Sequence, residues 1–261
     1  MTAEPNDPIA SARLALACLD LTTLNDGDTE ADVLELCARA HGPHGHVAAV
    51  CVWPRFAALA RRALPPNIAV AAVANFPDGS ADLARAVADT RAIVAAGAQE
   101  VDVVLPFARL QQGDERAAAD LLAAVRAASP GLALKVILET GVLNDDALIR
   151  RASQLALDAG ADFLKTSTGK TPISATPEAA RAMLATIAAD PHAAARVGFK
   201  ASGGIRTVAD AALYFALVEQ ALGAAALTPA RLRIGASSLL NDIEAVLAGR
   251  APAPPAAPGS Y

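Results

Sequence analysis

Residues 132–169 read LALKVILETGVLNDDALIRRASQLALDAGADFLKTSTG, and this stretch contains the unit from which the rest of the chain is built. An apolar run at 132–139 is followed by an amphipathic segment that stops at Gly160, and a second apolar run covers 162–166. Short apolar runs that alternate with longer amphipathic segments are typical of parallel strands joined by helices. Glycine suits the end of such a helix, because it adopts the left-handed backbone found there. The stretch therefore predicts a βαβ unit.

The same alternation extends along the chain in both directions. Thr29 and Asp32 resemble a helix-capping pair, and Pro54 and Pro177 suit first helical positions. Eight strands close a parallel barrel, and 261 residues suit one such domain. We therefore expect the α/β class and a single-domain (β/α)8 TIM barrel, with strands at residues 14–21, 47–52, 68–73, 100–105, 132–139, 162–166, 197–200 and 232–236.

Both ends of the chain are expected to lie outside the barrel. We assign residues 1–10 to an N-terminal leader, 11–250 to the barrel and 251–261 to a tail. The tail reads APAPPAAPGSY, so its prolines exclude a helix and its side chains offer little to bury. We expect this tail to be flexible.

The composition disfavours several classes of protein. A net charge of −5 provides no broad basic surface for nucleic acid. No apolar run approaches the roughly 18 residues of a membrane span, and the opening MTAEPNDPIA lacks the basic and apolar parts of a signal peptide. Cys18, Cys37 and Cys51 are odd in number and lack metal-type spacing, which fits reduced thiols. We expect a cytoplasmic protein that binds neither nucleic acid nor membranes.

Three histidines lie close together in the sequence. His41, His44 and His46 precede the second expected strand, so they belong at the N-terminal end of the barrel. Active sites of this fold lie at the other end. A histidine cluster can bind zinc, but a solvated loop is the simpler interpretation, and we expect no metal site.

Lysine is rare in this chain and placed selectively. The chain has eighteen arginines but only four lysines, which are Lys135, Lys165, Lys170 and Lys200. Arginine cannot lose its proton in a protein, so it cannot attack a carbonyl group to form a Schiff base. Lysines at the ends of strands therefore indicate amine chemistry. The alternative is that coding bias replaced lysine by arginine and left four survivors.

Lys165 and Lys200 end the sixth and seventh expected strands, whose backbones would lie ~4.8 Å apart in the barrel. Two ammonium groups ~6 Å apart repel by roughly 3 kcal/mol, which leaves one amine largely neutral near physiological pH. A neutral amine is a nucleophile. The pattern leaves open which lysine attacks, and whether either one is instead paired with an acid such as Asp102 or Glu139.

Asp102 lies in an otherwise apolar strand, in the segment EVDVVLP at 100–106. A buried carboxylate needs a partner, and a nearby lysine could supply it. In that position the carboxylate could carry protons during imine formation. The alternative is a purely structural ion pair.

Two glycine-rich segments follow neighbouring strands at the expected active end. Gly203 and Gly204 follow the seventh strand, and Gly235, Ser237 and Ser238 introduce the last helix. Backbone amides in such segments can bind a phosphate, and the loops after strands seven and eight form the phosphate site of many barrels. Lys170 and Arg206 could add positive charge.

Six segments together resemble the deoxyribose-phosphate aldolase family. They are LDLT at 19–22, EVDVV at 100–104, KVILET at 135–140, GADFLKTSTG at 160–169, GFKASGGIR at 198–206 and GASS at 235–238. The resemblance implies a barrel that reversibly cleaves 2-deoxy-D-ribose 5-phosphate to D-glyceraldehyde 3-phosphate and acetaldehyde. It also implies a role in deoxyribonucleoside catabolism, no metal and no organic cofactor, and a possible homodimer.

The resemblance implies roles for individual residues. The Schiff-base lysine of the family corresponds to Lys165, the lysine that perturbs it to Lys200, and the proton donor and acceptor to Asp102. Cys51 matches a thiol that lines the site in some members. Contacts to the substrate or its phosphate correspond to Asp20, Thr22, Thr168, Lys170, Gly203, Gly204, Gly235, Ser237 and Ser238.

The end of the chain carries a further expectation from the resemblance. Some members end in a tyrosine that protonates the enamine intermediate, and this chain ends in Tyr261. Two rival functions stay open. Another Schiff-base barrel, of the transaldolase type, would share the lysine but not this tyrosine. A non-catalytic barrel that binds sugar phosphates would need the phosphate loops but not the lysine pair.

Overall fold

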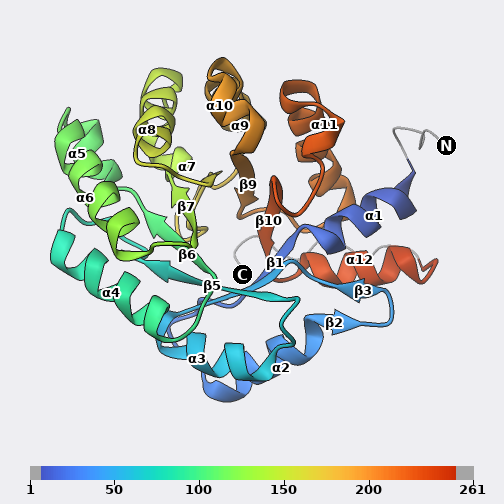
Figure 1. Cartoon of the computed structure of the whole chain (residues 1–261). Helices are drawn as coiled ribbons and strands as arrows, with labels where there is room; N and C mark the ends of the chain where they lie inside the picture. The colour runs from blue at the N-terminus through green and yellow to red at the C-terminus, as the bar shows by residue number, and fades with distance from the viewer. Residues whose placement is uncertain (1–6, 251–261) are drawn as a thin grey trace.

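The computed structural model describes residues 7–250, which form a closed barrel of eight parallel strands inside a ring of helices (Figure 1). Strand β1 pairs with both β4 and β10, which closes the barrel. The predicted (β/α)8 barrel is therefore confirmed. Its strands are β1 Leu19–Thr22, β4 Ala49–Val52, β5 Ala69–Ala74, β6 Glu100–Val104, β7 Ala133–Ile137, β8 Phe163–Lys165, β9 Gly198–Ser202 and β10 Leu232–Ala236.

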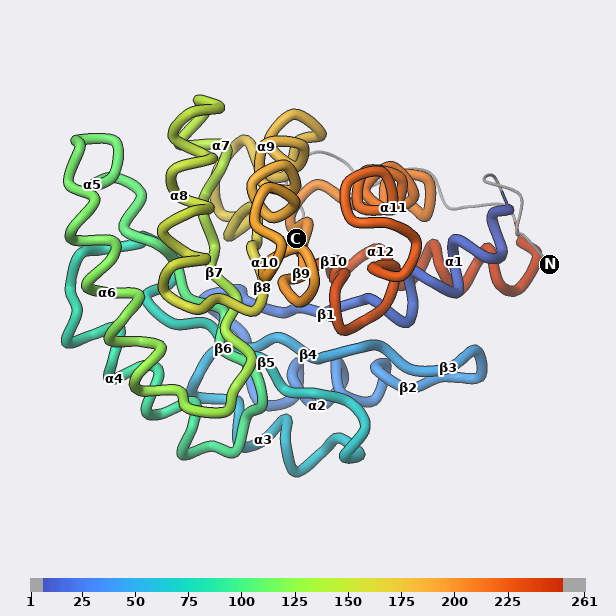
Figure 2. The backbone as a smooth tube through the Cα atoms, turned by 45° about the horizontal axis from the view of Figure 1, so that its top comes forward, coloured from blue at the N-terminus to red at the C-terminus, as the bar shows by residue number. Residues whose placement is uncertain are grey.

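Three helices begin at the residues that the sequence marks. Thr29 and Asp32 form a capping box at the start of α2, and Pro54 and Pro177 are the first residues of α3 and α9. Figure 2 shows how the helices wrap the barrel. They are α1 Pro8–Ala17, α2 Glu30–Arg39, α3 Pro54–Ala63, α4 Leu83–Ala95, α5 Phe107–Gln111, α6 Glu115–Ala128, α7 Thr140–Leu143, α8 Asp146–Asp158, α9 Pro177–Ala189, α10 Pro191–Arg196, α11 Val208–Leu222 and α12 Leu239–Leu247, with a 3₁₀ turn η1 at Ala224–Ala226.

The first strand is shorter than predicted. Residues 14–17 belong to helix α1, which packs against α11 and α12 and which Asp7 caps by accepting a hydrogen bond from the amide of Ile9. The prediction of a strand from residue 14 was wrong, because an unbroken run of Ala and Leu fits a buried helix as well as a buried strand. Residues 8–10, assigned above to a leader, form the first turn of this helix.

The histidines lie where the sequence placed them. His41–Gly42 and Gly45–His46 form a small antiparallel hairpin, β2 and β3, before strand β4. They are therefore at the N-terminal end of the barrel. The described helices in residues 7–250 include none that is long and apolar enough to cross a membrane.

The strands lie between an apolar layer, where they pack against the helices, and the interior of the barrel. Apolar side chains such as Val101, Leu164 and Phe199 belong to the large hydrophobic core that joins the strands to the helices. The barrel interior instead holds charged side chains that are almost completely buried. Because all eight strands are parallel, their carboxyl ends meet at one rim, and the site is described from there.

Candidate active site

Lys165 and Lys200 face each other across neighbouring strands. They are direct register partners of β8 and β9, as the predicted strand order required. The Nζ atoms of Lys165 and Lys200 lie 2.8 Å and 2.7 Å from the same oxygen, Oδ2 of Asp102. The two amines and the carboxylate predicted from the sequence thus meet at a single point, with no apolar wall between the amines.

The carboxylates of the barrel interior make more contacts with Lys200 and Lys135 than with Lys165. Lys200 also donates to Asp20 at 2.5 Å. Lys135 donates to Asp102 at 2.7 Å and to Glu100 at 2.5 Å. Each of these two lysines contacts at least two carboxylates, whereas Lys165 contacts only Asp102 among the described acidic side chains.

A fourth cation completes this buried network. Arg233 donates to Asp20 at 2.7 Å and to Glu100 at 2.8 Å. The three carboxylates of Asp20, Glu100 and Asp102 therefore face four basic side chains. If all were charged, the network would carry one excess positive charge inside the barrel. Loss of one proton restores neutrality, and the lysine with the fewest anionic contacts loses it at the lowest cost.

The pKa shifts have the same pattern. Burial and the neighbouring Lys200 lower the pKa of Lys165, although Asp102 opposes them. Burial also acts to lower the pKa of Lys200, but Asp102 and Asp20 outweigh it and raise that pKa above its ordinary value. The sequence left the two lysines equivalent. The geometry distinguishes them and makes Lys165 the amine that most readily becomes neutral.

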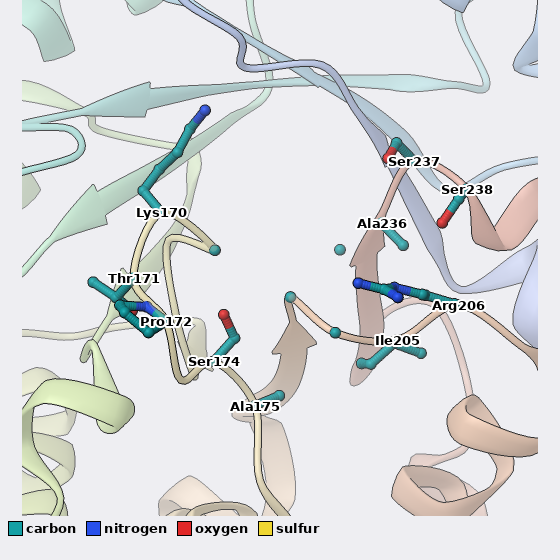
Figure 3. Close-up of a pocket in the computed structure, with 14 residues that line it drawn as sticks. Lys170, Thr171, Pro172, Ser174, Ala175, Ile205, Arg206, Ala236, Ser237 and Ser238 are labelled. Carbon is teal, nitrogen blue, oxygen red and sulfur yellow. The ribbon is translucent and has the colours of Figure 1, made fainter. Parts of the chain in front are cut away.

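A cavity of about 450 Å³ opens at the carboxyl ends of β8, β9 and β10, and its lining residues follow Lys165 and Lys200 along the chain without including them (Figure 3). Figure 3 shows the guanidinium of Arg206 reaching toward its centre, with Ser174 on the opposing loop. Six of the predicted substrate residues line this cavity, namely Lys170, Gly203, Gly204, Gly235, Ser237 and Ser238.

The backbone of this cavity suits an anion. Gly203 and Gly204 both have positive φ values, 84° and 82°, a conformation that favours glycine. Consecutive residues of this kind can turn their amide groups toward one ligand. Helix α12 begins directly after Ser238, so its N-terminal end faces the same space. Such an end attracts negative charge.

Gly235 has a second reason to be glycine. A Cβ atom at this position would lie 3.1 Å from Cε of Lys200 and would collide with Oγ of Ser202. The missing side chain therefore provides the space through which Lys200 reaches the acids. This role was not visible in the sequence.

The remaining predicted residues lie deeper. Asp20 is fully buried and its carboxylate contacts Lys200 and Arg233. Thr22 ends β1 and its hydroxyl donates to the carbonyl oxygen of Asp20 at 2.8 Å. Cys51 is fully buried in an apolar cluster with Val73 and Phe76, and burial raises the pKa of its thiol. Tyr261 lies outside the described residues.

Thr168 is held by a residue that the sequence did not assign to the substrate. Its hydroxyl donates to Oε2 of Glu139 at 2.5 Å, and Thr171 donates to Oε1 of the same carboxylate at 3.2 Å. Glu139 is fully buried with a left-handed backbone, φ 57°. It connects the end of β7 to the loop that carries Thr168 and Lys170.

Three members of the buried network were missed by sequence reasoning as site residues. Glu100, Lys135 and Arg233 each interrupt an apolar strand with a charge. That interruption is the available signal, because a charge in a buried strand requires a partner. Which partner it finds depends on the register, which the sequence does not give.

A comparison with known families matches most of the chain. Residues 14–245 match the profile described as DeoC/LacD family aldolase. A curated relative, the deoxyribose-phosphate aldolase of Agrobacterium fabrum, is 48% identical over 256 residues, which covers 97% of this chain and 98% of the relative.

Solved structures agree in fold. A presumed deoxyribose-phosphate aldolase from Coccidioides immitis matches with a TM-score of 0.77 and 29% identity, over 90% of this chain and 87% of that one. The tetrameric deoxyribose phosphate aldolase from Aeropyrum pernix matches with a TM-score of 0.69 and 26% identity, over 92% and 97% of the two chains.

Proposed function

Since the chain belongs to the DeoC/LacD family of aldolases, we propose that it is an aldolase that cleaves 2-deoxy-D-ribose 5-phosphate reversibly to D-glyceraldehyde 3-phosphate and acetaldehyde. The name of the relative from Agrobacterium fabrum supports this substrate, as does the cavity suited to a phosphate. The observation that carries the proposal is the buried amine of Lys165, which shares one carboxylate oxygen with Lys200.

The reaction begins when the neutral amine of Lys165 attacks the aldehyde carbon of the open-chain sugar. Loss of water from the resulting carbinolamine gives a protonated imine, which accepts the electron pair of the breaking carbon–carbon bond. Asp102 lies within hydrogen-bond distance of the Lys165 amine, so it can take up and return the protons that these steps require. Lys200 stays protonated and keeps the neighbouring amine neutral.

Cleavage releases D-glyceraldehyde 3-phosphate and leaves an enamine on Lys165. Protonation of the enamine carbon gives the acetaldehyde imine, and water then hydrolyses this imine to free acetaldehyde and regenerate the lysine. We assign the protonation step to the phenol of Tyr261, following the resemblance stated above. Replacement of Tyr261 by Phe is expected to slow the exchange of solvent protons into acetaldehyde, while imine formation continues.

We place the phosphate in the cavity formed by the loops after β8, β9 and β10, because its backbone suits an anion. Arg206 and Lys170 supply positive charge there, and the N-terminal end of α12 adds to it. This leaves the sugar aldehyde to extend toward Lys165. We further propose a cytoplasmic enzyme of deoxyribonucleoside breakdown that acts as a homodimer.

Reductive trapping tests this function. Incubation with acetaldehyde and a borohydride reductant is expected to add one two-carbon group to Lys165, located by peptide mass spectrometry. Lys165→Arg replaces the amine by a guanidinium, which cannot form an imine, so the variant should lose both the adduct and the cleavage activity. An unmodified chain, or an adduct confined to Lys200, would reject the mechanism. Binding of the sugar phosphate without any adduct would favour a binding barrel.

A further inference from the structure

Arg233 is a member of the buried network that reaches the N-terminal rim of the barrel. Two hollows at this rim reach it, one lined by Ala48 and Gln99 and the other by Leu132 and Asp162, which are residues that precede strands. The side chain of Arg233 is only 9% exposed. It therefore separates the charges of the barrel interior from solvent on the side away from the proposed substrate cavity.

The strand register connects Arg233 to Lys165. Arg233 is the register partner of Lys200, and Lys200 is the register partner of Lys165, so three basic side chains follow one another on β10, β9 and β8. Two strand spacings place the first and last of these backbones roughly 10 Å apart. The guanidinium of Arg233 also lies 5.4 Å from the ring centre of Phe163, two residues before Lys165 on the same strand face.

Shared carboxylates provide a second connection. Arg233 shares Asp20 with Lys200 and shares Glu100 with Lys135. Both of these lysines in turn share Asp102 with Lys165. A change in the charge of Arg233 therefore alters how much of the Asp102 carboxylate is available to the amine of Lys165.

We propose that Arg233 is a positioning residue that keeps the amine of Lys165 unprotonated by occupying Asp20 and Glu100 at the N-terminal end of the charge network. This rests on the proposed function, in which Lys165 forms the Schiff base. Arg233 touches no reacting atom. It acts by sharing Asp20 with Lys200 and Glu100 with Lys135, which leaves both lysines also in contact with Asp102.

The groups that face Lys165 come from several strands. Asp102 on β6 favours the protonated amine, while Lys200 on β9 favours the neutral one. Cys51 lies on β4, and Lys135 and Glu139 belong to β7 and its carboxyl end. Among the described acidic side chains only Asp102 contacts Lys165, and Lys200 is the neighbouring cation. The protonation of the Lys165 amine therefore depends on how strongly other cations neutralise Asp102.

Removal of the guanidinium is expected to favour the protonated amine for two reasons. In Arg233→Met a fixed positive charge is lost, and Asp20 and Glu100 draw Lys200 and Lys135 away from Asp102. Both effects raise the pH at which Lys165 becomes reactive, by roughly half to one unit for a charge at this separation. Below that pH, the rate of imine formation should fall about three- to ten-fold.

The experiment measures borohydride-dependent incorporation of acetaldehyde at Lys165 as a function of pH. Arg233→Met should shift the midpoint upward, and Arg233→Lys, which keeps the charge, should restore most of the wild-type midpoint. Arg231→Met is the matched control, because Arg231 lies at the same rim and donates to the backbone oxygens of Ala194, Ala195 and Val197. It should leave the midpoint unchanged.

Glu100→Gln gives a second test with the opposite sign. Loss of this carboxylate drives Lys135 toward Asp102, so the midpoint should move downward. Equal midpoints in wild type, Arg233→Met and Glu100→Gln would overturn the proposal, as would failure of both variants to fold while Arg231→Met folds. Absence of any Lys165 adduct in the wild type would instead reject the proposed function.

Discussion

Lys200 and Lys165 occupy equivalent places on neighbouring strands, yet they differ in the number of carboxylates that they contact. Replacing Lys200 by Met should abolish most activity, because Asp20 and Asp102 lose a cation and the Lys165 amine regains its proton. Since Lys200 lowers the pKa of Lys165, its removal should move the acid limb of the pH profile of kcat/KM to higher pH. Lys200→Arg should retain the acid limb. An unmoved limb in Lys200→Met would contradict this electrostatic role.

Two adjacent hydroxyl groups give opposite expectations for stability. The hydroxyl of Ser167 is buried and has no hydrogen-bond partner among residues 7–250. Ser167→Ala removes this unpaired buried group and should therefore leave the free energy of unfolding unchanged or raise it. The hydroxyl of Thr166 accepts from the amide of Ser202 at 3.0 Å. Thr166→Val leaves that amide unpaired and should cost about 1–3 kcal/mol in urea denaturation. A similar cost in both variants would show that Ser167 has a partner in solution.

At the scale of elements, Glu139 holds the loop between β8 and α9 through Thr168 and Thr171. Glu139→Ala should release this loop, which carries Lys170 in the proposed phosphate cavity. We expect KM for the sugar phosphate to rise several-fold, whereas trapping of acetaldehyde at Lys165 should stay near the wild-type rate. Glu139→Gln keeps one acceptor oxygen and should recover part of the affinity. An equal loss in both assays would assign Glu139 to the fold alone.

Strand positions are easier to predict from this sequence than the contacts of the buried charges. Seven of the eight strands lie at the predicted places, because a short apolar run bounded by turn residues has few alternatives inside a parallel barrel. The predicted start of the first strand was wrong, because its apolar run continues from helix α1. The adjacency of Lys165 and Lys200 follows from strand order alone. The contacts of Arg233 and Glu100 do not, because a slip of one residue would turn each side chain away from the interior.

At the scale of the whole molecule, the buried network makes folding stability depend on pH. The surrounding cations outweigh burial and lower the pKa values of Asp20 and Asp102 below their ordinary range. A carboxyl with a depressed folded-state pKa contributes stability above its unfolded pKa, which is about 3.9 for aspartate. This contribution is lost as the pH falls toward the folded value. The free energy of unfolding in urea should therefore drop steeply below about pH 4.

An exposed pair provides the control for this pH dependence. Asp146 and Arg150 form an ion pair on the surface of α8. Asp146→Asn should leave the acid transition unchanged, whereas Asp102→Asn should lower stability at neutral pH and flatten the transition. Stability that is constant from pH 7 to pH 3 would show that the network does not hold its acids in the charged form.

In the proposed mechanism the amine of Lys165 is neutral under conditions in which Lys200 and Lys135 stay protonated. Because the chain has only four lysines, ¹³C labelling of lysine Cε gives a spectrum in which each amine can be titrated separately. The signal missing from Lys165→Arg should titrate below the ordinary lysine value of about 10.4, and the signals of Lys200 and Lys135 should titrate above it. A Lys165 signal that titrates at or above the ordinary value would contradict the proposed mechanism.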